Sequence, residues 1–132
     1  MGSHHDVLAG VIGQPLSLPP ALVDRFPELA AVRWRRGGLP VRVAGLFLGR
    51  SSVAAITLWR TVFVSPHARL DAELLLHELR HVHQFEANAA FPVLYLWESL
   101  VRGYHQNRFE ADARASASNR LRWYPRNRLS QR

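Results

Sequence analysis

Apolar residues recur at helical spacing directly after a proline-rich stretch near the start of the chain. They are Leu22, Val23, Phe26, Leu29 and Ala30. Because Pro20 suits a first helical turn and a glycine pair follows at 37–38, we predict a helix over residues 21–34. Pro27 lies within this range, and a proline inside a helix can kink or break it.

Two neighbouring stretches, residues 41–48 and 53–64, are rich in β-branched and other apolar side chains. Residues 49–52, which lie between them, are typical of a turn. In the second stretch, apolar side chains occupy both alternating faces, as in a strand that is covered on both sides. We therefore predict a hairpin whose second strand lies inside a sheet or across it.

Three helices are predicted in the C-terminal half. Asp71 is a suitable N-cap for a helix over residues 71–88. A second helix opens with a proline and spans residues 92–102, and Asn107 caps a third over residues 107–121. The patterns together predict an α+β fold, in which a short β-sheet or hairpin packs on the helix at 71–88 and on two or three further helices.

The chain has the size of one domain, with 132 residues of which 48% are hydrophobic. We predict a single domain over residues 7–121. Residues 1–6 resemble the remnant of an expression tag, and residues 122–132 form an arginine-rich tail.

The charge balance is strongly basic, with 17 Lys and Arg residues against 10 Asp and Glu, and every one of the 17 is arginine. A basic surface attracts nucleic acid, anionic lipid or acidic proteins. A genome that encodes arginine in place of lysine explains the composition equally well. No apolar run approaches the roughly 18–20 residues that span a bilayer, so we expect a cytoplasmic protein. Cysteine is absent, which excludes disulfides and thiolate metal ligands.

The segment His77-Glu78-Leu79-Arg80-His81 carries the strongest chemical signal. His77 and His81 are four residues apart on the predicted helix, so their imidazoles share one face and can bind one metal ion. Glu78 lies beside that face, where its carboxylate can take a proton from a metal-activated water. The flanking leucines place this helix in the core, where an unpaired His or Glu is costly to bury. An ordinary solvated helix face is the alternative.

A catalytic zinc site needs a third protein ligand and an open position for water. Glu110 is favoured as that ligand because it lies one turn into the predicted helix at 107–121. Ala113, one turn further on, keeps the same face small enough to approach the other helix. His83 faces away from the histidine pair, whereas His105 could replace or assist Glu110.

The motif HELRHVHQ, followed by YHQNRFEADA, resembles the gluzincin clan of zincins. It is most similar to the smallest single-domain members, the minigluzincins and the peptidase-like core domains of bacterial contractile injection systems. The resemblance covers about residues 53–118 and implies His77, His81 and Glu110 as Zn²⁺ ligands, with Glu78 as general base. It also implies that a strand within residues 57–64 pairs with an extended substrate.

The chain departs from thermolysin-like enzymes four residues after Glu110, where Arg114 replaces an aspartate. Support for the histidine rings must therefore come from another group, with Glu98 or Asp112 as candidates. We expect no second subdomain after Leu121 of the kind that closes the cleft over a substrate in larger gluzincins.

Tyr104 or His105 could donate a hydrogen bond to a developing oxyanion, as peptide hydrolysis requires. Tyr104 is equally suited to covering the core. His67, in the loop before the site helix, has no expected role in catalysis.

Two functions fit these observations. The first is zinc-dependent hydrolysis of a peptide or protein substrate. The second is a non-catalytic or latent zincin-fold module that binds an acidic protein or nucleic acid through its arginine-rich surface. The segment at 120–128 interleaves arginine with aromatic residues, which suits nucleic acid but equally suits covering the edge of the domain.

Overall fold

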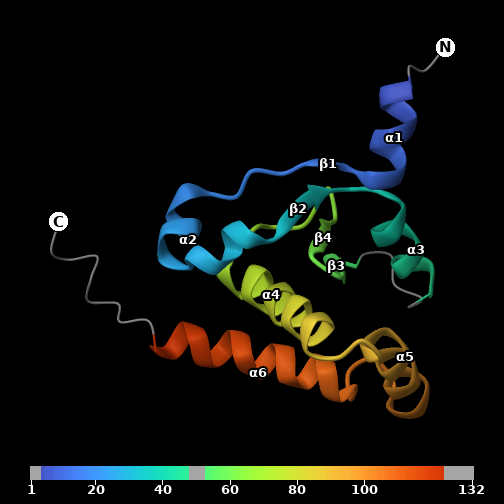
Figure 1. Ribbon diagram of the computed structural model, residues 1–132, viewed down its shortest axis with the longest axis vertical. Helices are drawn as coiled ribbons and strands as arrows, with labels where there is room; N and C mark the ends of the chain where they lie inside the picture. The colour runs from blue at the N-terminus through green and yellow to red at the C-terminus, as the bar shows by residue number, and fades with distance from the viewer. Residues whose placement is uncertain (1–3, 48–52, 124–132) are drawn as a thin grey trace, which may run out of the picture.

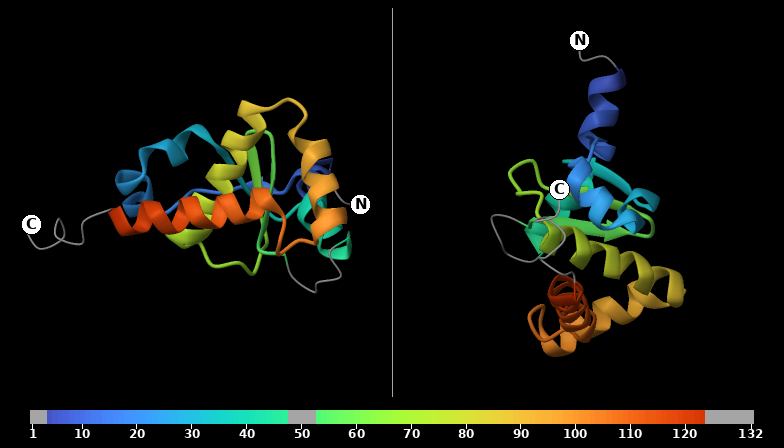
Figure 2. Two further views of the ribbon diagram at one scale, coloured as in Figure 1. Left: turned by 90° about the horizontal axis from the view of Figure 1, so that it is seen from below. Right: turned by 90° about the vertical axis from the view of Figure 1, so that its left-hand side faces the viewer.

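The computed structural model describes residues 4–47 and 53–123 of the chain and confirms the α+β class (Figure 1). The elements in chain order are α1 (His4–Ile12), β1 (Gln14–Pro15), α2 (Pro20–Arg25), the 3-10 helix η1 (Pro27–Ala31), β2 (Arg33–Arg36), α3 (Leu39–Phe47), β3 (Ala55–Leu58), β4 (Thr61–Val64), α4 (Ala72–Ala87), α5 (Phe91–Arg102) and α6 (Arg108–Trp123). Helix α4 lies between the sheet and α6, so the molecule is built in layers (Figure 2). No described helix is long and apolar enough to cross a membrane.

The four strands form one mixed sheet in the order β1-β2-β4-β3. Strand β4 is parallel to β2 and antiparallel to β3. The prediction of an interior strand is thus confirmed for β4, whose Val62 and Val64 are fully buried. Strand β3 forms an edge of the sheet. This edge borders the site described below.

The predicted helix at 21–34 is wrong in its second half. Pro27 ends α2 because its ring nitrogen has no hydrogen to donate, and the chain continues as η1. Residues from Arg33 onward then form β2 rather than helix. Val32 and Trp34 are buried while Arg33 is exposed, which is the two-residue period of a strand. Pairing with β4 decides this outcome, because that partner is distant in the sequence.

The predicted strand at 41–48 is also wrong, since residues 39–47 form helix α3. Val41 is buried and Val43 is exposed, although a strand would place both on one face. The predicted turn at 49–52 lies outside the described residues. The hairpin forms instead within the second apolar stretch, where Trp59 takes a left-handed conformation (φ 54°) between β3 and β4.

The three C-terminal helices are confirmed. Asp71 caps α4 by accepting a hydrogen bond from the Leu74 backbone N–H at 2.8 Å. Asn107 caps α6 by accepting one from the Phe109 backbone N–H at 2.9 Å. Helix α6 extends to Trp123, two residues beyond its predicted end, and the remainder of the predicted tail lies outside the described residues. At the N-terminus, α1 includes residues 4–6 of the predicted tag.

Asn107 also joins α5 to α6 through its side-chain amide. Its Nδ2 group donates to the backbone oxygen of Tyr95 at 3.1 Å and to the Ser99 hydroxyl at 2.8 Å. Asn107 is completely buried, so each of these bonds replaces contacts with water. This side chain therefore holds the first turn of α6 against α5.

Replacing Asn107 with alanine should lower the free energy of unfolding by about 2–3 kcal/mol, because a helix cap and two buried hydrogen bonds are lost together. The matched control is Asp71→Ala, which removes only an exposed cap and should cost about 1 kcal/mol. Urea denaturation of both variants measures the difference. Equal losses would show that the links to α5 contribute nothing.

Candidate metal centre

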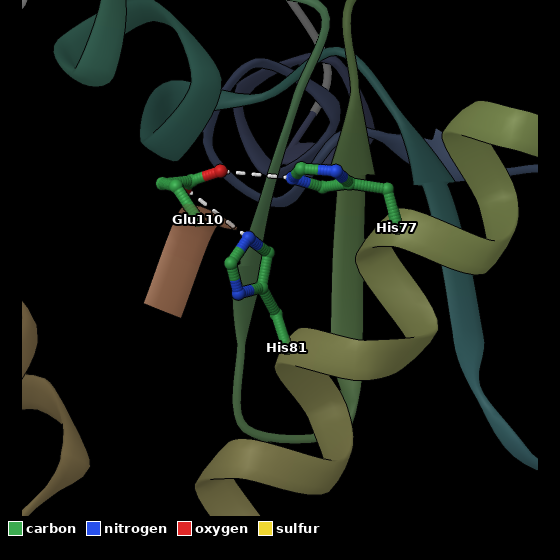
Figure 3. Close-up of side chains that lie close together, drawn as sticks. All are labelled: His77, His81 and Glu110. Carbon is green, nitrogen blue, oxygen red and sulfur yellow. Dashed lines mark hydrogen bonds and ion pairs between the residues drawn. The ribbon is translucent and has the colours of Figure 1, made fainter. Parts of the chain in front are cut away.

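The predicted histidine pair and Glu110 meet in the structure (Figure 3). Helix α4 presents His77 and His81 on one face, with ring centroids 4.9 Å apart. Glu110 approaches from α6, with Oε2 at 2.9 Å from His77 Nε2 and Oε1 at 3.1 Å from His81 Nε2. One ligand atom from each residue lies within 4.8 Å of the others, so the three can hold one metal ion.

The close approach of α6 to α4 brings Glu110 into reach. Ala113 and Ala117, on the face of α6 that turns inward, are both fully buried. Their small side chains let the two helices pack closely, as was predicted for Ala113. Glu110 lies in the first turn of α6, where the positive end of the helix dipole favours a carboxylate.

A tyrosine that the sequence analysis did not single out also contacts Glu110. The Tyr95 hydroxyl, on α5, donates to Glu110 Oε1 at 2.6 Å. Glu110 therefore accepts hydrogen bonds from α5 as well as facing α4. The available signal was the position of Tyr95 four residues after Phe91, which places it on the buried face of that helix.

His81 is oriented by a glutamine on its own helix. Its Nδ1 atom lies 2.8 Å from Gln84 Oε1. Gln84 Nε2 donates to the Phe109 backbone oxygen at 3.0 Å and to Asp112 Oδ2 at 2.9 Å. Because those two partners only accept, the amide oxygen of Gln84 must face His81, and His81 Nδ1 must carry a proton. The Nε2 lone pair of neutral His81 is then directed toward Glu110.

Of the two carboxylates predicted to support a histidine ring, Asp112 does so indirectly and Glu98 has another partner. Asp112 supports His81 through Gln84 and is itself paired with Arg80 at 2.7 Å. Glu98 instead pairs with Arg102 at 3.1 Å. Gln84 was missed, although its place three residues after His81 on one helix face was a usable signal.

Glu78 is buried and turned toward the sheet. Its Oε2 atom accepts a hydrogen bond from the Thr57 hydroxyl of β3 at 2.7 Å. It therefore lies beside the three-residue group, between α4 and the edge strand. This position suits a residue that acts next to a metal rather than on it.

The centre carries coupled charges. Burial alone would lower the pKa of His81, but the hydrogen bond with Glu110 and the charge of Glu78 outweigh it and raise this pKa to about 9. Burial alone would raise the pKa of Glu110, but hydrogen bonds from His77 and His81 hold it well below its usual range. Burial and the charge of Glu110 raise the pKa of Tyr95 far above its usual value, so its hydroxyl remains a donor.

These residues fit a metal ion. Without a cation, the lone pair of neutral His81 would face the Glu110 carboxylate at 3.1 Å, which is an unfavourable contact between two acceptors. A proton relieves this contact, and a metal ion would relieve it equally. Two imidazole nitrogens and one carboxylate are ligands that zinc and several other divalent transition metals accept.

The remaining predicted residues lie outside this group. Tyr104 is half-buried and its ring lies 5.6 Å from that of His105, between α5 and α6. The role of Tyr104 at an oxyanion stays a prediction. His83 and His67 are exposed. Arg114 donates to the backbone oxygen of His105 at 2.6 Å and so has a structural contact of its own.

Comparisons with family models, curated proteins and solved structures found no match to this chain.

The stability of the metal-free protein should fall as the pH rises. His81 has a folded-state pKa of about 9 against 6.5 for the free side chain, so its contribution is complete below pH 6.5 and is lost as the pH passes through about 9. The expected loss of unfolding free energy is about 3 kcal/mol over that window. Urea denaturation with a chelator present measures it. The control His81→Gln should show a nearly flat profile, and an equally steep one would contradict the assignment.

Tyr95→Phe removes only the hydroxyl that orients Glu110 and should weaken zinc binding about 10- to 100-fold, as is typical when a partner of a metal ligand is lost. Competition with a fluorescent chelator measures the affinity. Trp123→Phe is the control, because this aromatic side chain is 86% exposed at the far end of α6 from Glu110, and it should leave the affinity unchanged. Equal affinities for wild type and Tyr95→Phe would show that the contact does not position Glu110.

Proposed function

We propose that this chain is a zinc-dependent peptide hydrolase, in which His77, His81 and Glu110 hold the ion and Glu78 is the general base. The observation that carries the proposal is the meeting of three suitable ligand atoms within 4.8 Å, from two helices distant in the sequence. The orientation of His81 by Gln84 adds support, because it leaves the correct nitrogen free to bind the ion.

The arrangement of the elements around the site, and not only the HExxH motif, is what the resemblance to gluzincins implies. The histidines lie on a helix packed under the sheet, and the glutamate comes from a separate later helix. Strand β3 forms an edge antiparallel to its neighbour and contacts the candidate base. These features support membership of a zincin-like fold as part of the proposal.

In the proposed reaction, bound zinc would polarise the scissile carbonyl and lower the pKa of the attacking water. Glu78 takes a proton from that water and passes it to the leaving amine. Thr57 positions Glu78 by donating to one carboxylate oxygen, which leaves the other free for the proton.

Substrate binding is proposed at the outer edge of β3, the edge that faces away from β4. Within the part of the chain that the structure describes, only β4 pairs with β3, so the outer edge can add an extended peptide through main-chain hydrogen bonds. Thr57 lies on this strand and contacts Glu78, so a peptide bound there would lie next to the candidate base.

The alternative function, binding of an acidic partner through arginines, finds less support. Several described arginines already have partners within the domain. Arg36 donates to the backbone oxygens of residues 65, 66 and 68. Arg80 and Arg120 pair with carboxylates. A latent zincin module that binds zinc without cleaving peptides remains the closest competing proposal.

The test combines metal analysis with one isosteric substitution. The purified chain should bind about one zinc ion, and Glu78→Gln should retain it, because Glu78 lies outside the ligand group. Cleavage of a mixed peptide library, followed by mass spectrometry, should occur with wild type and fall at least about 100-fold with Glu78→Gln.

The outcomes separate the proposals. Failure to bind zinc after reconstitution would overturn both the hydrolase and the latent module. Zinc binding without any cleavage would leave the latent module. Cleavage by Glu78→Gln at the wild-type rate would remove Glu78 as general base. His81→Gln is the control that should lose both zinc and cleavage.

A further inference from the structure

The outer face of α5 is a continuous apolar stripe. It consists of Val93, Leu96, Trp97, Leu100 and Val101, which are between 59% and 83% exposed. Their spacing of three, four, seven and eight residues from Val93 places them on one side of the helix. The other side carries Phe91, Tyr95 and Ser99 and faces the domain. Side chains this exposed protrude from the surface, so the stripe is a ridge and not a groove.

Two other helices expose apolar residues and lie on the same side of the molecule as α5. The exposed side chains are Val7, Leu8, Val11 and Ile12 on α1, and Leu39 and Val43 on α3. Figure 1 and the left view of Figure 2 show α1, α3 and α5 along one side of the molecule, opposite α2 and the C-terminal end of α6, with α1 and α5 far apart along the long axis. The exposed apolar residues are therefore spread over three separate helices along one side.

Charged residues beside the stripe are predominantly positive. Arg102, in the last turn of α5, and Arg108, at the start of α6, are both exposed. Glu98 is the acidic residue of α5, and its carboxylate lies 3.1 Å from Arg102 and 3.9 Å from Arg108, so one carboxylate faces two guanidinium groups. The whole chain carries a formal net charge of +7. A partner for the stripe should accordingly be apolar where it meets the stripe and anionic around it.

We propose that this side of the molecule docks on an anionic lipid surface, with the outer face of α5 lying among the headgroups. A bilayer surface accepts protruding apolar side chains from several helices at once, whereas a protein partner would need a matching groove for each. Tryptophan favours the membrane interface, and arginine binds lipid phosphates. Helix α5 has 12 residues, too few to span a bilayer, so it lies in the plane of the surface.

The test is co-sedimentation of the full chain with vesicles of phosphatidylcholine, alone or mixed with phosphatidylserine. The wild type should bind the mixed vesicles more strongly. The double variant Leu96→Ser/Leu100→Ser should bind them at least about tenfold more weakly, because two apolar side chains no longer leave water. Both residues are exposed, so the variant should fold, and an unchanged thermal midpoint together with retained zinc binding would verify this.

Tryptophan fluorescence provides a matched pair of controls. Trp97 lies in the stripe, and Trp123 is 86% exposed at the C-terminal end of α6, away from it. On addition of mixed vesicles the emission should shift to shorter wavelength in wild type and in Trp123→Phe. The shift should be lost in Trp97→Phe.

Three results would overturn the proposal. One is equal vesicle binding by wild type and the double serine variant. Another is vesicle binding that added salt abolishes but that the two serine substitutions do not change. Such binding would come from arginines outside the stripe. The third is absence of vesicle binding combined with a dimer in sedimentation that the double variant disrupts, which would place a second copy of the chain on the stripe. None of these results depends on peptide hydrolysis, so the proposed function is tested separately.

Discussion

The carboxylate of Glu110 is the point on which the arrangement of the three C-terminal helices depends. It faces two imidazoles from α4 and accepts a hydrogen bond from Tyr95 of α5, while its own backbone belongs to α6. A buried carboxylate is costly unless each oxygen has a partner, and here both oxygens have one. The same carboxylate is also a suitable metal ligand. The contacts of Glu110 therefore both stabilise the packing of the three helices and form the candidate metal site.

The groups around Glu110 are in turn held by residues that have no expected role as ligands. Asn107 fixes the start of α6 against α5, Gln84 selects the tautomer of His81, and Thr57 holds Glu78 against the edge of the sheet. Asn107 and Thr57 each connect two elements that are separate in the sequence. Gln84 turns the ring of His81 toward Glu110. The site is consequently preorganised, which is the property that a hydrolytic centre requires of its scaffold.

Helix α5 has two faces with different tasks. Its inner face supplies Tyr95 to Glu110, and its outer face exposes an apolar ridge that includes Leu96 and Trp97. Adjacent residues of one helix thus belong to the candidate metal centre and to the proposed lipid contact. A surface on which α5 lies would be separated from the candidate metal ligands by α5 itself. Under the proposed hydrolysis, segments of protein close to a membrane would be the substrates nearest to the site.

The sequence by itself determined the local features of this protein. The caps at Asp71 and Asn107 defined where α4 and α6 begin, and the four-residue spacing placed His77 and His81 on one helix face, because capping and helical period depend only on neighbouring residues. Glu110 was also identified in advance. Tertiary structure alone decided which distant segments pair. Residues 33–36 became a strand because β4 lies beside them. Helix α3, which packs against α1, β3 and β4, formed where a strand was predicted, and it buries Val41 while it leaves Val43 exposed. The hydrogen bond from α5 to Glu110 likewise follows from packing, since no local pattern specifies which side chain of one helix meets a carboxylate on another.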